Sequence, residues 1–479
     1  MSGMTSWSPT VTSPGEWLRN TWLPEPLLSF GDGGRHVDPK EGIARYGPHS
    51  MGGASHPSEL RVGIIGTAGL IETTNEWLRR NAEGVGGNET NPRFAGFGSN
   101  RGFMCRLENS ADWNALLSSK DVAETTTIRS QQERFEAAVS LLESKLRSVA
   151  ELDRPPDCVI IALPAEMYRR CRVAEYYDKE LGGRVHRDLR RAFKAVAMRH
   201  RIPTQMLRER TVTTGDGTPA SKVAWNFFTG RYTKAGGHPW SPTDLQAGSC
   251  FVGIGFYRPH GEGRTVQSSV VQAFDEHGEG LILRGQDFEW DPRKEETPSP
   301  HLPEAQAHDL LTRALSRYSD VLGQTPRRVV VHKTSRYWPD ELAGLRAAAS
   351  EVTEQVDFLA LAGQSRFRMV PPSRYPPLRG TRVQIGRLDY LYTTGFVPAL
   401  GEFHGMHVPA PIEIADHIGG DTGRTQLLRE ILTLTKLNWN SAALSGKFPI
   451  TLRFSRLVGD ILRELPAGQE PLPQFKYYM

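Results

Sequence analysis

Cysteine is scarce in this sequence, and long apolar runs are absent from it. Four cysteines occur in 479 residues, and none has the C-x-x-C spacing typical of a zinc site. We therefore expect buried, reduced thiols at Cys105, Cys158, Cys171 and Cys250, which argues against a disulfide-stabilised secreted domain. No run of about 18 apolar residues occurs, and the first residues lack the basic-then-apolar pattern of a signal peptide. We expect a cytoplasmic protein that makes no membrane contact.

Acidic residues are scarce in one part of the chain. Between Arg184 and Lys234, twelve lysines and arginines accompany three acids, a local net charge of +9 in a chain whose total is +4. The rest of the chain therefore carries a net charge of −5. A basic block within a folded domain is more often a solvated face than a site, but this concentration favours a polyanionic partner.

The chain is long enough for two or three units with substantial cores. Residues 1–58, rich in glycine, proline and histidine, are expected to form an extended leader packed on the core. Residues 59–243 alternate apolar strands with helices, which predicts a parallel sheet with helices on its faces. The strands are expected at 60–65, 158–162 and 205–211, and the helices at 70–80, 131–152, 186–199 and 219–229.

Residues 244–479 follow a different order of elements. Three consecutive strands are followed by helix, strand, helix and strand, which is the order of a ribonuclease-H-like fold. A hairpin and two helices complete the chain. The expected strands are 250–257, 268–275, 280–284, 328–332, 358–362, 383–386 and 390–394, and the expected helices are 305–322, 340–350, 421–437 and 452–465.

The basic block contains residues suited to a phosphate monoester. Arg190 and Lys194 lie four apart on the expected basic helix, and Arg187 and Arg191 form a second such pair. Gln205 begins the next strand, and Lys234 follows the next helix. A phosphate monoester needs charge neutralisation and several directed hydrogen bonds, which cations and a neutral donor from separate elements supply. Surface cations and an ordinary loop glutamine are the alternative interpretation.

Several stretches resemble Argonaute proteins. HRDLRRAFKAVAMRHRIPTQ and SKVAWNFFTGRYTKAGGHPW look like their MID domain, whereas SCFVGIGFYRP, RRVVVHKTSRYW and LTKLNWNSAALSGKFPITLRFSRLVGDIL look like their PIWI domain. The opening EPLLSFGDGGRHVDPKEGIARYGP resembles the leader of short prokaryotic Argonautes, which lack the N and PAZ domains. The resemblance implies a Rossmann-like MID domain at 59–243, followed by a ribonuclease-H-like PIWI domain at 244–479.

The resemblance also implies a pocket for the 5′-phosphate of a guide RNA. That pocket falls on Arg190, Lys194, Gln205 and Lys234, with Arg190 where many relatives have tyrosine or histidine. In several relatives the C-terminal carboxylate enters the pocket through a divalent ion. Here the carboxylate belongs to Met479, so Mg²⁺ at the phosphate is an expected cofactor; a trailing C-terminal tail is the alternative.

The PIWI segment departs from the pattern of cleaving relatives. Two metal ions about 4 Å apart need three or four carboxylate or histidine ligands. Gly255 stands in place of the first carboxylate, Lys333 in place of the third, and Ser455 in place of the last; Glu279 could mimic the second. Other carboxylates occupy none of the family positions: Asp275, Glu276, Asp389, Glu413 and Asp416. We therefore expect no catalytic residue and a PIWI domain that does not cleave.

A short, non-cleaving Argonaute implies a sensing function. Guide RNA would pair with single-stranded target DNA and activate a partner bearing an APAZ domain fused to a TIR, Sir2 or nuclease effector. The two chains would form a heterodimer acting in antiviral defence by abortive infection. The alternatives are a self-sufficient guide-directed nuclease and an unspecific nucleic-acid-binding α/β protein. Candidate contacts to the duplex backbone are Lys436, Asn438, Asn440, Lys447 and Arg453.

Overall fold

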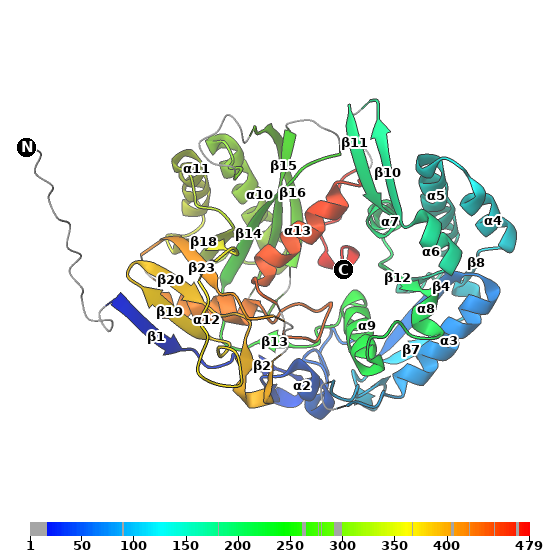
Figure 1. Cartoon of the computed structure of the whole chain (residues 1–479), viewed down its shortest axis with the longest axis horizontal. Coiled ribbons are helices and arrows are strands. Elements are labelled where there is room, and N and C mark those ends of the chain that lie inside the picture. Colours follow the sequence, from blue (N-terminus) through cyan, green and yellow to red (C-terminus); the bar gives the residue numbers. More distant parts are fainter. Residues whose placement is uncertain are drawn as a thin grey trace, which may run out of the picture.

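The protein is described here by a computed structural model (Figure 1). It describes residues 17–88, 91–180, 182–260, 265–275, 277–278, 280–291, 299–365, 367–403, 407–420, 422–444, 446–465 and 469–479. The segment 59–243 forms one half of the molecule and most of 244–479 forms the other, with the C-terminus between them. Within the described ranges, no helix is long and apolar enough to cross a membrane.

The first half is built on a parallel sheet, as predicted. The strand order is β12-β9-β4-β7, with β8 also paired to β4, and every pairing is parallel. The central strand β9 is buried along its whole length, because its run of Val, Ile, Ala and Leu is covered on both faces. The elements are β4 (Glu59–Gly66), α3 (Ala68–Ala82), β7 (Arg106–Glu108), β8 (Ala115–Leu116), α4 (Ser119–Thr127), α5 (Gln131–Ala150), β9 (Cys158–Leu163), α6 (Ala165–Cys171), β12 (Thr204–Arg208), α8 (Glu209–Val212) and α9 (Ala220–Lys234).

The basic helix is shorter than predicted, because a hairpin precedes it. Strands β10 (Val173–Asp178) and β11 (Gly183–Asp188) pair antiparallel, and α7 runs over Leu189–Ala197. Asp188 caps α7 by accepting a hydrogen bond from the backbone N–H of Arg191 (3.1 Å). The predicted helical pairing of Arg187 with Arg191 is therefore wrong, since Arg187 belongs to β11.

The second half contains a nine-stranded sheet in the order β1-β19-β20-β23-β18-β17-β14-β15-β16. Strands β14, β15 and β16 form an antiparallel meander, while β17 runs parallel to β14 and β18 parallel to β17. This is the predicted ribonuclease-H-like arrangement. Its elements are β14 (Ser249–Tyr257), β15 (Thr265–Phe274), β16 (Gly280–Glu289), α10 (Glu304–Leu322), β17 (Arg328–Lys333), α11 (Pro339–Ser350), β18 (Val356–Ala362), β19 (Thr381–Ile385), β20 (Leu388–Leu391), β23 (Ile412–Ile418), α12 (Arg424–Leu434) and α13 (Ile450–Leu462).

Helices cover both faces of this sheet. Cys250, Val252 and Ile254 of β14 pack with residues of α10 and α11 in one apolar cluster. The alternate residue Phe251 belongs to another cluster, with α12 and α13. Side chains thus alternate between the face under α10 and α11 and the face under α13. In the neighbouring strand β17, only alternate side chains can therefore lie under α13.

The leader is more structured than predicted, and it joins both halves. Strand β1 (Leu18–Trp22) extends the large sheet by pairing with β19, and β2 (Leu28–Ser29) pairs with β13 (Ser241–Pro242) and with β3 (Arg35–His36). Residues Pro39–Tyr46 form the helix α2, whose N-cap Asp38 accepts from the N–H of Lys40 (2.8 Å). The Asp-Pro pair that begins this helix is a recognised helix start.

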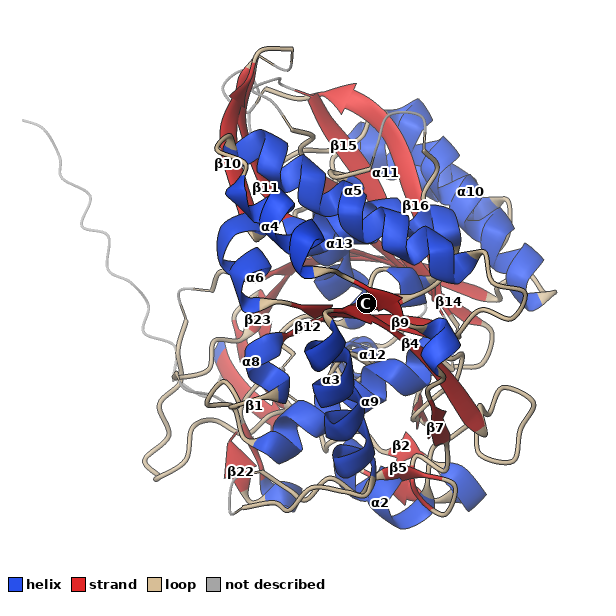
Figure 2. Cartoon of the chain, turned by 90° about the vertical axis from the view of Figure 1, so that its right-hand side faces the viewer, coloured by secondary structure: helices blue, strands red, loops and turns tan. Residues whose placement is uncertain are grey.

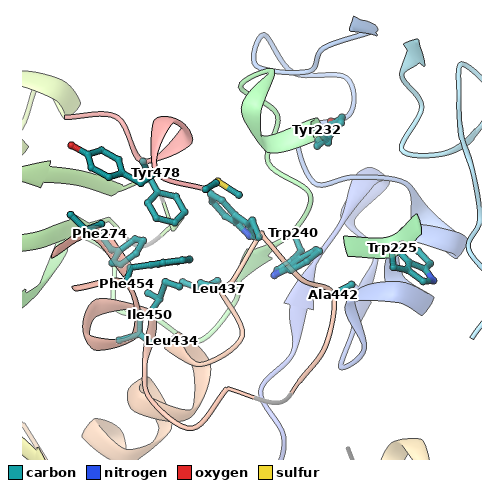
Figure 3. Close-up of a cluster of buried hydrophobic side chains, with 14 of the residues drawn as sticks. Trp225, Tyr232, Trp240, Phe274, Leu434, Leu437, Ala442, Ile450, Phe454 and Tyr478 are labelled. Atoms are coloured by element: carbon teal, nitrogen blue, oxygen red, sulfur yellow. The ribbon is translucent and has the colours of Figure 1, made fainter. Parts of the chain in front are cut away.

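The two halves share a core. Trp225, Trp240, Phe274, Phe454 and Tyr478 belong to a single cluster of buried apolar residues (Figure 3). The indole N–H of Trp240, near the end of the first half, donates to the carbonyl of Lys436 in the second half (3.0 Å). The junction is therefore a packed interior, and groups placed there are withdrawn from water.

Candidate nucleic-acid interface

Two lysines of the predicted phosphate pocket converge on the start of β12. Lys194 on α7 and Lys234 at the end of α9 both donate to the carbonyl of Thr204, each at 3.2 Å. Lys234 also donates to the side-chain oxygen of Gln205. Both lysines are buried, with 3% and 1% of their surfaces exposed. The structure thus brings Lys194, Gln205 and Lys234 together.

The C-terminus enters the same place. The terminal Met479 is 1% exposed, and its backbone oxygen accepts from the ammonium of Lys194. Figures 1 and 2 both show the C-terminus beside β12. The preceding turn is held by Phe475 against Phe454, with ring centroids 4.1 Å apart, and by the hydroxyl of Tyr478, which donates to the carbonyl of Leu472 (2.8 Å). The C-terminal residues therefore pack in the pocket, as the resemblance implied, and do not trail away from it.

The pocket holds more positive than negative charge. Burial lowers the pKa of Lys194 well below its ordinary value, and the nearby Arg190 and Arg231 lower it further. Burial, followed by Lys194 and Arg231, lowers the pKa of Lys234 in the same way. Desolvated cations are costly unless an anion accompanies them, and the one carboxylate in contact with these lysines is that of Met479 among the described residues. The site is therefore suited to a further anion.

Arg231 is a member of this cluster that sequence reasoning missed. It lies one helical turn before Lys234 on α9 and is 1% exposed. None of its three guanidinium nitrogens has a hydrogen-bond partner within the described part of the chain. Its guanidinium carbon lies 5.0 Å from the ring centroid of Phe227. The predicted helix ended at residue 229, whereas α9 continues to Lys234, so the helical spacing of Arg231 and Lys234 was not part of the sequence prediction.

Arg190 is placed at an outer cavity. It is exposed and, with Tyr168, Arg172, Arg208 and others, lines a cavity of about 340 Å³. The guanidinium carbons of Arg172 and Arg208 lie 5.4 and 5.7 Å from the ring centroid of Tyr168. Aromatic and guanidinium planes are the groups on which unpaired bases stack. This cavity has the chemistry to receive a nucleotide.

A larger cavity, of about 860 Å³, lies over α13 and the end of β14. Gly255, Thr334 and Ser455 line it together. A Cβ added at Gly255 would lie 2.5 Å from the Cβ of Ser455, so the packing of α13 leaves no space for a side chain there. The charged residues of the lining are one acid and five bases: Asp460, Arg191, Arg258, Arg453, Arg456 and Arg463.

The structure corrects the assignment of Lys333. This residue points to the opposite face of the sheet, where its ammonium lies 2.5 Å from a carboxylate oxygen of Glu341, both side chains being fully buried. Thr334, the next residue, lines the cavity with Gly255 and Ser455 instead. Because successive strand residues face opposite sides, Lys333 cannot repel metal ions at that cavity. The predicted mimic Glu279, like Glu276, lies outside the described residues.

The other carboxylates that the structure describes do not assemble a metal site. Asp389 lies in β20, not in the turn between the expected strands 383–386 and 390–394, and pairs with Arg382 (2.7 Å). Glu413 and Asp416 lie in β23. Across the described ranges, no group of three or more histidine, cysteine, aspartate or glutamate residues is arranged to hold a metal ion.

Of the five candidate duplex contacts, Lys436 is buried in this structure, with 3% of its surface exposed. Its ammonium is buried beneath the leader, where it donates to the carbonyls of Pro26 (2.6 Å) and Val37 (2.7 Å) and lies 2.9 Å from Glu25. A side chain held in this way is not available to a phosphate.

The other four candidates differ in their surroundings. The side-chain oxygen of Asn438 accepts from the N–H of Asn440 (3.3 Å), a turn contact, and Lys447 donates to the carbonyl of Gly363 (2.6 Å). Arg453 lines the larger cavity, and one of its terminal nitrogens is buried without a partner in the described structure. Of these four residues, Arg453 is therefore the best placed to contact the phosphate backbone of a duplex.

The Mg²⁺ that the resemblance implies does not fit the phosphate pocket. Magnesium requires oxygen ligands free to coordinate it. One oxygen of Met479 and the carbonyl of Thr204 accept from Lys194, and the same carbonyl and the side-chain oxygen of Gln205 accept from Lys234. The unpartnered guanidinium of Arg231 adds a further cation, which repels a metal ion.

The fold matches solved Argonaute structures. Clostridium butyricum Argonaute, bound to a guide DNA and a 19-mer target DNA, gives a TM-score of 0.65 at 16% identity over 96% of this chain and 55% of that one. Aquifex aeolicus Argonaute gives 0.58 at 16% identity over 96% of this chain and 55% of that one, and Drosophila Piwi gives 0.59 at 11% identity over 96% and 56%. No family model and no curated protein matches the sequence.

These likenesses confirm the predicted fold class. The chain has an Argonaute-like fold with a ribonuclease-H-like PIWI unit, and the similarity extends over nearly all of it. The chain spans little more than half the length of the structures that it matches. At these identities the likeness concerns the fold; the chemistry has to be argued from the residues.

Proposed function

We propose that this chain, built on an Argonaute-like fold, binds a 5′-phosphorylated guide RNA and uses it to recognise single-stranded target DNA. The observation that carries the proposal is the cluster of buried cations around Thr204, which one carboxylate among the described residues accompanies. A terminal phosphate supplies the missing negative charge, and sequence recognition is left to base pairing, as in other guided systems. The outer cavity beside Arg190 provides space for the first nucleotide.

We further propose that the chain holds its target without cutting it. Cleavage by two metal ions needs carboxylates on the face under α13, and Gly255, Thr334 and Ser455 line the cavity there. The arginines of that cavity suit contact with a phosphate backbone but disfavour metal ions. Target binding, not catalysis, is the activity that this chemistry supports.

Retention of intact DNA is the expected result for the loaded protein. Guide-loaded protein is incubated with labelled single-stranded DNA, complementary or scrambled, in Mg²⁺ or Mn²⁺. We expect it to retain the complementary strand at full length, because pairing gives specificity and Asp460 is the one carboxylate in the described lining of the cavity, too few for two metal ions. Guide-specific cleavage would contradict the non-cleaving proposal, and equal retention of both strands would indicate unspecific binding.

A partner chain would then carry the response in the cytoplasm. The resemblance to short prokaryotic Argonautes supports a heterodimer with an APAZ protein fused to a TIR, Sir2 or nuclease effector, acting in abortive infection. Co-expression with the neighbouring open reading frame tests this proposal. We expect the two products to co-purify and the effector to act when complementary DNA is added. A neighbouring product that remains separate and unaffected by target would contradict the heterodimer.

A further inference from the structure

We propose that the guanidinium of Arg231, and not a divalent metal ion, supplies the remaining positive charge of the phosphate site, so that guide loading needs no metal. The inference rests on the proposed binding of a 5′-phosphorylated guide. The inference adds Arg231 to the phosphate site and removes Mg²⁺ from the cofactors expected there.

The position of Arg231 points to a ligand. Arg231 and Lys234 lie one turn apart on the same face of α9, and this helix contacts the C-terminal turn at Phe475–Tyr477. All three guanidinium nitrogens are buried without a partner in the described part of the chain. The ring of Phe227 provides a cation–π contact from one side but no anion. A buried, permanently charged group with five unused donors requires an acceptor with several oxygens, which a phosphate is.

The charges around the site leave no role for a metal ion. Lys194, Arg231 and Lys234 contribute three positive charges when all are protonated, and Met479 contributes one negative charge. A phosphate monoester carries a charge of about −2 at neutral pH, so these three cations balance the anions without a metal ion. A divalent ion would create an excess of positive charge and would compete with ammonium groups for the oxygens of the site.

Arginine is the residue type suited to this replacement. Burial lowers the pKa of Lys194 and Lys234, so that part of their charge depends on the anion being present. A guanidinium remains protonated when it is desolvated, and it binds two phosphate oxygens at once. Arg231 is thus the fixed charge that a metal ion would otherwise provide.

The decisive measurement compares metal and chelator on the unmodified protein. Dissociation constants are measured for one short RNA with a 5′-phosphate or a 5′-hydroxyl, in Mg²⁺ and again in EDTA. We expect the phosphate to be preferred in both buffers, by factors that agree within about twofold. A preference that falls tenfold or more, about 1.4 kcal/mol, in EDTA overturns the inference but leaves the proposed function standing. Equal affinity for the two RNAs in Mg²⁺ overturns the proposed function itself.

Substitutions test the residue independently. Arg231→Met keeps the length of the side chain and removes its charge; we expect the phosphate preference to fall roughly 10- to 100-fold in both buffers, as for a lost charge-assisted contact. The unliganded variant should unfold at the same or a higher temperature, since a buried unpaired cation is removed. Arg210→Met, at an exposed arginine of α8, is the matched control and should change neither property. If Arg231→Met and Arg231→Lys both kept the unmodified protein's preference for 5′-phosphorylated RNA, Arg231 would not be a phosphate ligand.

Discussion

Replacing Lys194 and Lys234 together by alanine should abolish the preference for a 5′-phosphorylated guide. Both ammonium groups are buried beside the carbonyl of Thr204, so each contact with a phosphate is made out of water. Hydrogen bonds to charged groups are worth about 1.5–3 kcal/mol each, so the double substitution should lower affinity for the phosphorylated RNA at least a hundredfold. Affinity for the 5′-hydroxyl RNA should fall only by the long-range electrostatic contribution of two charges, because the phosphate alone reaches these groups. The measurement is the ratio of the two dissociation constants.

A charge-matched control separates this local effect from the general attraction of RNA to a basic protein. Lys120→Ala with Lys222→Ala removes the same two charges from exposed positions, one of them on α9 itself. We expect this variant to lose affinity for both RNAs equally, as a long-range electrostatic term does, and to keep their ratio. A ratio that persists in the Lys194/Lys234 variant would show that the phosphate binds elsewhere.

The elements with strong periodicity were predictable from sequence. Phe135, Val139, Leu142 and Leu146 lie at helical spacing, and the helix that they predict agrees with α5 to within two residues at its C-terminal end. The hairpin of β10 and β11 was not predicted, because Val173–Asp178 mixes exposed and half-buried residues with a single buried one, Ala174, and pairs with β11 along its length. Apolar periodicity in a sequence indicates which residues are buried, and few residues of this hairpin are buried.

The site was predictable where its members lie in stretches that resemble the Argonaute family, and not where tertiary contacts decide. Lys194, Gln205 and Lys234 do meet, as their placement on successive elements suggested. The error at Lys333 has a simple origin: a shift of one residue along a strand moves a side chain to the other face. Arg231 was missed because the pocket residues were taken from the resemblance to Argonautes, and that set did not include position 231.

Lys436 shows a different limit of sequence reasoning. The motif LTKLNWN offered it as a contact to nucleic acid, but its partner Glu25 lies in the leader, far away along the chain. Glu25 also lies 2.8 Å from Arg379, whose guanidinium donates to the hydroxyl of Thr435 (2.7 Å) and to the carbonyl of Leu432 (3.2 Å). One carboxylate thus joins the leader to two cations of the second half. Nothing in the local sequence around any of the three predicts this.

The removal of Glu25 should therefore destabilise the whole protein. Although burial alone would raise the pKa of Glu25, Arg379 and Lys436 hold it below its ordinary value, so the carboxylate is charged at neutral pH. Glu25→Ala leaves two cations with side chains no more than 1% exposed and without their common anion. Breaking a buried ion pair in this way costs about 3–5 kcal/mol, and we expect a loss of that size in the free energy of urea unfolding.

The exposed pair of Glu41 and Arg45 provides the matched control for this loss. Glu41 lies 3.2 Å from Arg45 on α2, in the same leader, with both side chains largely in solvent. Glu41→Ala should change the free energy of unfolding by less than about 0.5 kcal/mol, because exposed i,i+4 pairs contribute little. If Glu25→Ala were as mild as Glu41→Ala, the buried carboxylate would not anchor the leader to Arg379 and Lys436. The urea measurement thus tests whether one carboxylate joins the leader to the second half.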